Sequence, residues 1–210
     1  MKILKAADAF DKSAHIYQDK FMDVSIYAGA IDLFCDNITV AHARILDIAC
    51  GPGNITKYLA DRRPGYQILG IDLAPNMLDL ARINAPNAEF RLMDCRDIGS
   101  IGRKFDGIVC GFCLPYLTRE ETLQLITNVS GLLNAGGMFY LSTMEEDELN
   151  KSRYQTSSTG DQVYVNYHPE NYLREALLDH SFKIIDIKHF SETDKEGRVI
   201  TDLVLIGIKG

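Results

Sequence analysis

Two glycines and one acid are the residues whose types and spacing first indicate chemistry in this chain. Gly51 and Gly53 lie in ILDIACGPGNIT (residues 45–56), where a strand-prone apolar run breaks into a turn. Glycine lets a backbone approach a ligand that a Cβ would keep away. Asp72 ends the next apolar run, roughly 20 residues later, where an acid can accept from two ribose hydroxyls. The pattern predicts a nucleoside site, and an ordinary glycine turn is the plain alternative.

The same loop does not match a dinucleotide site. Such a site needs a third glycine in the order G-x-G-x-x-G. Thr56 stands at that position, and Pro52 removes one backbone donor from the turn. A pyrophosphate at a helix N-terminus would need those donors. The loop therefore favours a smaller ligand without phosphates.

These segments resemble the motifs of the class I S-adenosylmethionine-dependent methyltransferases. ILDIACGPGN is similar to the family's first motif, commonly D-x-G-x-G-x-G, with Ala49 at the first glycine. GIDLAPNMLDLAR (70–82) resembles the second motif and MDCRDI (93–98) the third. FDGIVCGFCLPYL (105–117) resembles the fourth strand, whose end lies beneath the transferred methyl. FDKSAHIYQDKF (10–21) resembles the N-terminal segment of many small-molecule members, and the resemblance extends over about residues 10–208.

The resemblance implies S-adenosylmethionine as cofactor, with S-adenosylhomocysteine as its product. Asp72 would hold the ribose, Leu73 and Met77 would flank the adenine, and Asp94 would accept from its amino group. The implied cofactor contacts are Tyr17, Asp47, Ala49, Gly51, Gly53, Asn54, Asp72, Leu73, Met77, Asp94, Cys95, Gly111 and Phe112. Simpler interpretations remain for three of them: Met77 has the spacing of a core residue, Asp94 suits a turn, and Tyr17 suits a packing helix.

The residues that would contact the methyl acceptor are less clearly marked. In the family the segment between the fifth and sixth strands covers the acceptor pocket, so Tyr154, Tyr164 and His168 are candidate contacts, with Tyr116 from the fourth motif. His168 is better suited to cap the helix that Pro169 begins than to contact the acceptor. No Ser-His-Asp or HExxH spacing occurs, so the catalytic residue is unassigned, with His168, His15 and Tyr116 as candidate bases.

The cysteines do not indicate a metal site or a redox site. Cys110-Gly111-Phe112-Cys113 has the spacing of a redox dithiol. Pro115 follows directly, and the next helix starts only near Thr118, so no helix N-terminus would lower the pKa of a thiol. A single such pair does not make a four-cysteine zinc site, and no metal is expected.

The elements that position these residues alternate as in an α/β fold. Strands are expected near 45–48, 67–72, 89–93, 105–109, 138–143, 183–190 and 199–208, with helices between most of them. Thr118 and Glu121 form a capping box, residues 134–137 end that helix, and residues 194–197 join the last two strands. A close hairpin is antiparallel, which simple βαβ repeats do not give. We expect a Rossmann-like doubly wound, mostly parallel seven-stranded sheet with an antiparallel seventh strand and helices on both faces.

Length and composition restrict the function further. The 210 residues suit one domain (1–210), with an N-terminal helical cap (1–40) and a lid insert (144–170). A net charge of −7 without a basic cluster disfavours nucleic acid. The sequence begins without the apolar core of a signal peptide and contains no apolar run of about 18 residues, so neither secretion nor a membrane span is expected. Five cysteines, an odd number, suit reduced thiols in the cytoplasm. We expect a monomer or a homodimer.

The function expected from all of this is methyl transfer from S-adenosylmethionine to an O, N or C nucleophile of a small molecule. Two alternatives stay open at this stage. One is a nicotinamide-dependent oxidoreductase, which shares the acid after the second strand. The other is a non-catalytic module that binds S-adenosylmethionine and whose acceptor pocket is filled or blocked.

Overall fold

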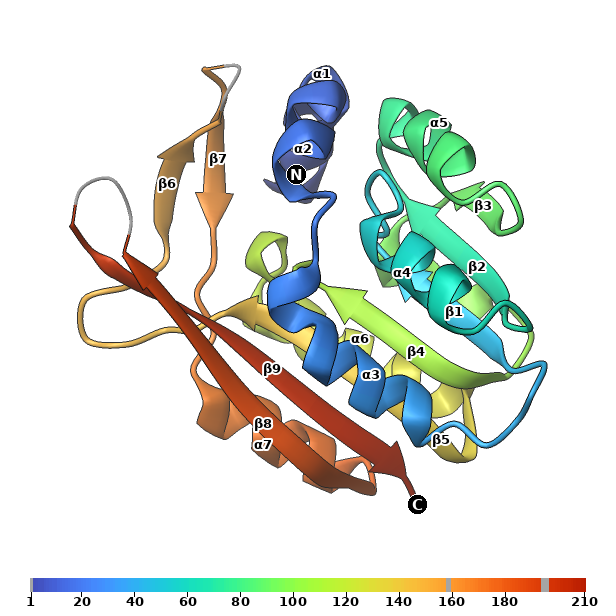
Figure 1. Ribbon diagram of the computed structural model, residues 1–210. Coiled ribbons are helices and arrows are strands. Elements are labelled where there is room, and N and C mark those ends of the chain that lie inside the picture. Colours follow the sequence, from blue (N-terminus) through green and yellow to red (C-terminus); the bar gives the residue numbers. More distant parts are fainter. Residues whose placement is uncertain (1, 158–159, 194–196) are drawn as a thin grey trace.

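A seven-stranded sheet forms the centre of the protein (Figure 1). The computed structural model describes residues 2–157, 160–193 and 197–210. The strand order is β3-β2-β1-β4-β5-β9-β8. The strands are β1 (Arg44–Ile48), β2 (Gln67–Asp72), β3 (Glu89–Leu92), β4 (Phe105–Gly111), β5 (Leu133–Met144), β8 (Phe182–Thr193) and β9 (Val199–Lys209). The first five are parallel, and β9 runs antiparallel to both β5 and β8. The expected sheet, with its reversed seventh strand, is confirmed.

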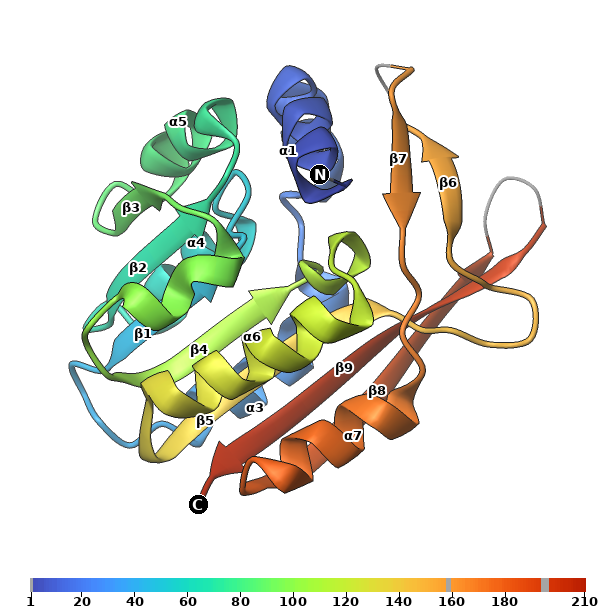
Figure 2. The ribbon, with the colours of Figure 1, turned by 180° about the vertical axis from the view of Figure 1, so that it is seen from behind.

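Helices cover both faces of this sheet (Figures 1 and 2). On one face lie α3 (Ala28–Asp36), α4 (Asn54–Arg62) and α5 (Pro75–Asn84), and on the other α6 (Arg119–Leu132) and α7 (Glu170–Asp179). Because side chains alternate along a strand, Ile45 packs with Phe34 of α3, whereas Leu46 packs in the cluster that contains Leu125 of α6. All four are buried, so the sheet is sandwiched as in doubly wound proteins.

The boundary between α6 and β5 differs from the expectation. The capping box is present, since Thr118 Oγ1 accepts from Glu121 N and Glu121 Oε2 accepts from Thr118 N. Residues 134–137, however, do not lie outside the strand. Leu133 already pairs with Phe105, and the pairing then shifts register before Met138. Gly136, with φ of +74°, allows the chain to bulge there without leaving the sheet.

The N-terminal residues are helical, in agreement with the helical cap expected from the sequence. They form α1 (Lys2–Lys12), α2 (Ala14–Phe21) and the 3₁₀ turn η1 (Ser25–Tyr27) before α3. Figure 1 shows α1 and α2 above the carboxyl end of β4. Asn76 holds α1, because its backbone N–H and its side chain donate to Asp11 at 2.7–3.1 Å. Asn54 holds α2 by donating to the Phe21 carbonyl at 2.9 Å.

The segment between β5 and α7 contains an unexpected strand. Residues 144–160 are polar and gave no strand signal, yet β6 (Arg153–Thr156) pairs antiparallel with β7 (Gln162–Val165). Val163 of β7 packs against Ala6 and Ala9 of α1, so this hairpin supports α1. Two residues that flank the whole segment lie near β8: His189 Nε2 is 3.3 Å from Glu145, directly after β5, and 3.4 Å from Glu170, the first residue of α7.

Two further 3₁₀ turns carry side chains discussed below: η2 (Cys95–Ser100) and η3 (Leu114–Tyr116). The expected turn at 194–197 falls almost entirely outside the described residues. Among the helices that the structure describes, none is both long and apolar enough to span a bilayer.

Candidate functional site

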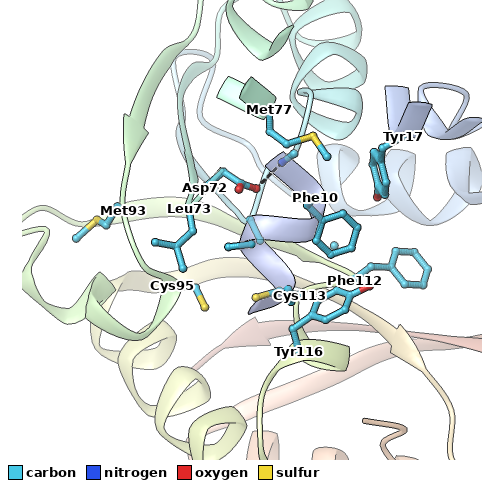
Figure 3. Close-up of a pocket in the computed structure, with 15 residues that line it drawn as sticks. Phe10, Tyr17, Asp72, Leu73, Met77, Met93, Cys95, Phe112, Cys113 and Tyr116 are labelled. Carbon is cyan, nitrogen blue, oxygen red and sulfur yellow. Dashed lines mark hydrogen bonds between the residues drawn. The ribbon is translucent and has the colours of Figure 1, made fainter. Parts of the chain in front are cut away.

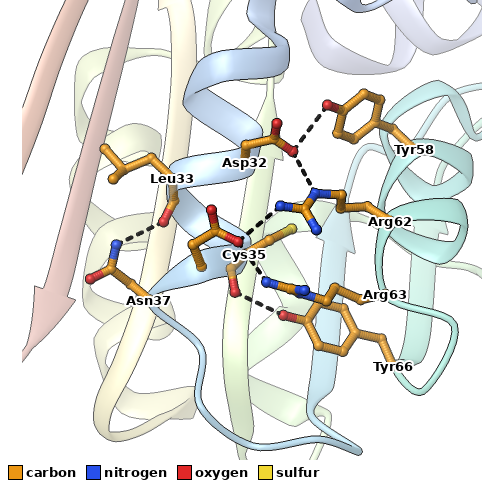
Figure 4. Close-up of polar contacts among 9 residues, drawn as sticks. Asp32, Leu33, Cys35, Asn37, Tyr58, Arg62, Arg63 and Tyr66 are labelled. Atoms are coloured by element: carbon orange, nitrogen blue, oxygen red, sulfur yellow. Dashed lines mark hydrogen bonds and ion pairs between the residues drawn. The ribbon is translucent and has the colours of Figure 1, made fainter.

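A pocket opens at the carboxyl ends of β1, β2 and β4, beneath α1 and α2 (Figure 3). Ligands of doubly wound proteins bind at this edge of the sheet. The pocket is lined by Ala6, Ala7, Phe10, Tyr17, Ala49, Gly51, Asp72, Leu73, Met77, Met93, Cys95, Gly111, Phe112, Cys113 and Tyr116.

Most of the residues expected at a cofactor site meet in this pocket. Those that line it are Tyr17, Ala49, Gly51, Asp72, Leu73, Met77, Cys95, Gly111 and Phe112, with Tyr116 from the acceptor candidates. Asp47, Gly53, Asn54 and Asp94 lie outside its lining. Ala6, Ala7, Phe10, Met93 and Cys113 line it without having been expected. The apolar 3–4 spacing from Ala6 to Phe10 is a helical signal that could have placed the α1 residues.

The loop after β1 adopts the backbone conformation that its glycines allow. Ala49, Gly51 and Gly53 have φ of +55°, +53° and +81°. A Cβ at Gly53 would lie 3.2 Å from Ala81, so this glycine serves the close packing of α4 on α5. A Cβ at Gly51 would have only Tyr17 near it, at 3.8 Å, so this glycine leaves open space on the pocket side.

Asp72 stands at the end of β2 and faces this loop. One carboxylate oxygen accepts from Gly51 N at 2.9 Å (Figure 3), and the other accepts from Ala74 N at 2.8 Å. Burial raises the pKa of Asp72 above its usual value, and these backbone N–H groups work in the opposite direction. Each oxygen keeps a lone pair, so the carboxylate is held in place with two acceptor sites free for vicinal hydroxyls.

Asp47 has a role inside the fold. Its carboxyl is buried and accepts from Thr56 Oγ1 at 2.6 Å. Burial raises the pKa of Asp47 to about 7. Thr56, which occupies the position of the third dinucleotide glycine, is itself fully buried and faces Asp47. Position 56 is therefore not exposed to a pyrophosphate.

Asp94 is engaged by its neighbour Arg96. The guanidinium donates to both Asp94 oxygens at 2.6–3.1 Å and also reaches Glu121 at 3.0 Å. Partial burial favours a higher pKa for Asp94, but the hydrogen bonds from Arg96 outweigh it and lower the pKa. Asp94 lines a shallow groove beside the pocket, together with Leu73 and Met93. Its contact with an adenine amino group stays a prediction, and the group would share the carboxylate with Arg96.

Three aromatic rings form one side of the pocket, which we call the aromatic wall: Phe10, Tyr17 and Tyr116 (Figure 3). The Phe10 ring meets Tyr17 edge-on at 5.6 Å and Tyr116 at 5.0 Å between centroids. Burial raises the pKa of Tyr17 to about 12 and that of Tyr116 well above its usual value. Both hydroxyls are therefore protonated at neutral pH and can donate a hydrogen bond to a ligand.

His168 does not cap α7, which corrects one expectation. Its ring is buried, and its two nitrogens contact the Tyr172 hydroxyl and the Leu114 carbonyl, the latter at 2.8 Å. Pro169 occupies the N-cap of α7 without a side-chain hydrogen bond. Asn166 donates to the neighbouring Pro115 carbonyl at 2.7 Å through its backbone. His168 and Asn166 thus fix η3, the turn that carries Tyr116 into the pocket.

The remaining acceptor candidates lie on the hairpin, away from the pocket lining. Tyr154 and Tyr164 contact each other edge-on at 5.0 Å, and Tyr154 is exposed. His15 is exposed on α2. The hairpin reaches the pocket only indirectly, because α1 lies between them and supplies the lining.

The dithiol spacing belongs to the core. All five cysteines are free and buried. Hydrogen bonding to Cys110 and burial raise the pKa of the Cys113 thiol. A thiol with a raised pKa is a poor nucleophile, so Cys113 is not an activated thiol.

The fold and the pocket together define a Rossmann-like, doubly wound protein with a pocket at the carboxyl edge of its sheet. Residues 45–137 match the family model described as a methyltransferase domain. The chain is 27% identical over 151 residues to a methyltransferase of Invertebrate iridescent virus 6, covering 70% of this chain and 56% of that protein. It is 29% identical over 119 residues to a ubiquinone biosynthesis O-methyltransferase of Xanthomonas campestris, covering 54% and 48%. The chain thus spans about half the length of these two relatives.

Among solved structures, the fold resembles magnesium protoporphyrin IX methyltransferase from Synechocystis with bound S-adenosylhomocysteine. The TM-score is 0.75 over the full length of both chains, at 17% identity. At that identity the likeness concerns the fold. The family match covers residues 45–137, which include the glycine loop and Asp72, and the structural likeness supports the Rossmann-like fold.

Proposed function

We propose that this protein transfers the methyl group of S-adenosylmethionine to a nucleophile of a small molecule. The observation that carries the proposal is the pairing of Asp72 with the Gly51 amide inside the pocket. A positioned carboxylate at the end of the second strand is suited to a ribose, and the glycine loop leaves the space beside it open.

The lining offers one acid and otherwise apolar side chains, which suits the ribose and adenine of an adenosyl sulfonium. Asp72 would accept from the ribose hydroxyls, and Leu73 and Met77 supply apolar surface for the adenine. Gly51 leaves space beside the loop, and Gly111 lines the pocket where β4 ends. When bound, the cofactor supplies an electrophilic methyl group on a positively charged sulfur. The residues of the chain bind it, hold the acceptor near it and keep water out, and such positioning alone can lower a barrier by several kcal/mol, up to about 7–11.

The nicotinamide alternative has little support in this chain. Thr56 is buried against Asp47 where the third glycine would face a pyrophosphate. The alternative of a non-catalytic binding module predicts that the acceptor part of the pocket is filled or blocked. Instead, the pocket runs on from Asp72 to Phe10 and Tyr116.

Five buried free thiols favour a reducing compartment, so we propose that the protein is cytoplasmic.

The test is to incubate the protein with methyl-labelled S-adenosylmethionine and a mixture of small acceptors. Expected products are S-adenosylhomocysteine and a labelled small molecule, both detected by mass spectrometry. A protein that binds NADH and does not bind S-adenosylmethionine would overturn the proposal. Binding of S-adenosylhomocysteine without turnover of any acceptor would favour the non-catalytic module.

A further inference from the structure

The pocket extends beyond the part that a nucleoside explains. Phe10 and Tyr116 lie on its far side from Leu73 and Met93 in Figure 3. Ala6 and Ala7 of α1 complete this part of the lining. The walls are apolar, and they come from α1 and η3 rather than from the glycine loop. An acceptor would lie against these side chains.

The charge of the lining limits what this acceptor can be. Among the described residues that line the pocket, none is lysine, arginine or histidine, and Asp72 is the one acid. Burying a carboxylate or phosphate without a partner is costly. When the donor is bound, its sulfonium is the positive charge beside the reacting atom, because the donor's own ammonium and carboxylate groups offset each other. It can match one negative charge, at the reacting atom, and leaves a second anionic group unpaired.

Apart from Asp72, which would hold the ribose, the same lining lacks a base. The hydroxyls of Tyr17 and Tyr116 have no hydrogen-bond partner among the described residues, and both stay protonated at neutral pH. They can donate to a polar atom of the acceptor and cannot take its proton. His168 is hydrogen-bonded at both nitrogens, and His15 is exposed on α2. A nucleophile here must lose its proton without help from the protein.

We propose that the acceptor is an uncharged, mostly apolar small molecule with a single thiol or acidic phenol. This inference rests on the proposed methyl transfer. A thiol with a pKa of about 8.5 ionises appreciably near neutral pH, whereas an aliphatic alcohol does not. The proton leaves to water first. The lone pair on sulfur or oxygen then forms the bond to the methyl carbon as the carbon–sulfonium bond breaks, and that electron pair stays on the donor's sulfur, which becomes a neutral thioether.

The deciding experiment measures kcat/KM against pH for acceptors of graded acidity: benzenethiol, 4-chlorobenzenethiol, 4-nitrophenol and benzyl alcohol. The midpoint of each profile is expected to follow the acceptor's own pKa, and benzyl alcohol is expected to be inert. A common midpoint for all acceptors would reveal a protein base and overturn the inference. Adding a carboxylate to the thiol, as in 4-mercaptobenzoate, should lower kcat/KM at least tenfold, and an equal or higher value would also overturn it.

A binding measurement keeps the inference testable if none of these compounds is methylated. Calorimetry on the protein saturated with S-adenosylhomocysteine compares methyl phenyl sulfide with 4-(methylthio)benzoate. The uncharged compound is expected to bind at least tenfold more tightly, and tighter or equal binding of the benzoate would overturn the inference. Binding of S-adenosylhomocysteine distinguishes a failure of this inference from a failure of the proposed function, because a protein that does not bind it would contradict the proposed function as well.

Variants assign the contact to named side chains. Tyr116→Phe keeps the ring and removes the donor, so the KM of a phenol acceptor should rise about threefold to tenfold. The affinity for S-adenosylhomocysteine should stay the same. Tyr154→Phe is the matched control on the exposed hairpin, and it should change neither quantity. An unchanged KM in Tyr116→Phe would remove this hydroxyl from the acceptor site.

Discussion

Ala49 offers a test of the loop that the site is built on. Its φ of +55° lies in the left-handed region, which costs a residue with a Cβ about 1–2 kcal/mol. Ala49→Gly removes that strain and adds about 0.4–1 kcal/mol of chain entropy to the unfolded state. The net gain in the free energy of unfolding should be roughly 0.5–1 kcal/mol, which corresponds to a rise in Tm of about 1–4 °C for a chain of this size. Equilibrium urea unfolding measures it.

Gly51→Ala provides the opposite change in the same turn. Gly51 has φ of +53°, and a Cβ there would meet only Tyr17, at an ordinary 3.8 Å. No clash is added, so the substitution should lower the free energy of unfolding by a similar roughly 0.5–1 kcal/mol. If Ala49→Gly destabilises the protein, or if both changes have the same sign, backbone strain does not govern this loop.

Two further predictions concern the elements around the pocket. Burial lowers the pKa of His168 below its usual 6.5, so the stability that depends on the neutral ring is complete above pH 6.5 and declines as the pH falls below it, by at most about 1.4 kcal/mol per pH unit. Urea unfolding at pH 5.5 and 7.5 should show a smaller difference for His168→Asn, and an unchanged difference would count against this assignment. Asn76→Ala removes the side-chain hydrogen bonds to Asp11 of α1, so the acceptor KM should rise about threefold to tenfold while S-adenosylhomocysteine affinity is retained. Asn76→Asp places two carboxylates together and should raise the KM further; equal KM values in both variants and the wild type would mean that this contact does not position α1.

The cofactor side of the pocket could be predicted from the sequence because its signals are local. Gly51 follows β1 and Asp72 ends β2, and the carboxyl ends of these neighbouring parallel strands meet at one edge of the sheet. The reversed last strand also has a local cause, since a close hairpin fixes its direction. These features needed no knowledge of distant contacts.

The acceptor side could not be predicted because it depends on contacts between distant segments. Phe10 reaches Tyr116 across more than a hundred residues, and no local pattern joins the two. His168 looked like a cap residue beside Pro169. Its partner is instead the carbonyl of Leu114, which only the folded chain brings near.

Calorimetric titration with S-adenosylhomocysteine tests the central claim, that the loop and Asp72 form a cofactor site. The wild type should bind one equivalent. Asp72→Ala should weaken binding by tenfold or more, since a hydrogen bond to a charged group contributes about 1.5–3 kcal/mol. Circular dichroism of the variant confirms that it is folded. No heat of binding in the wild type, or the same dissociation constant in a folded Asp72→Ala variant, would contradict the account.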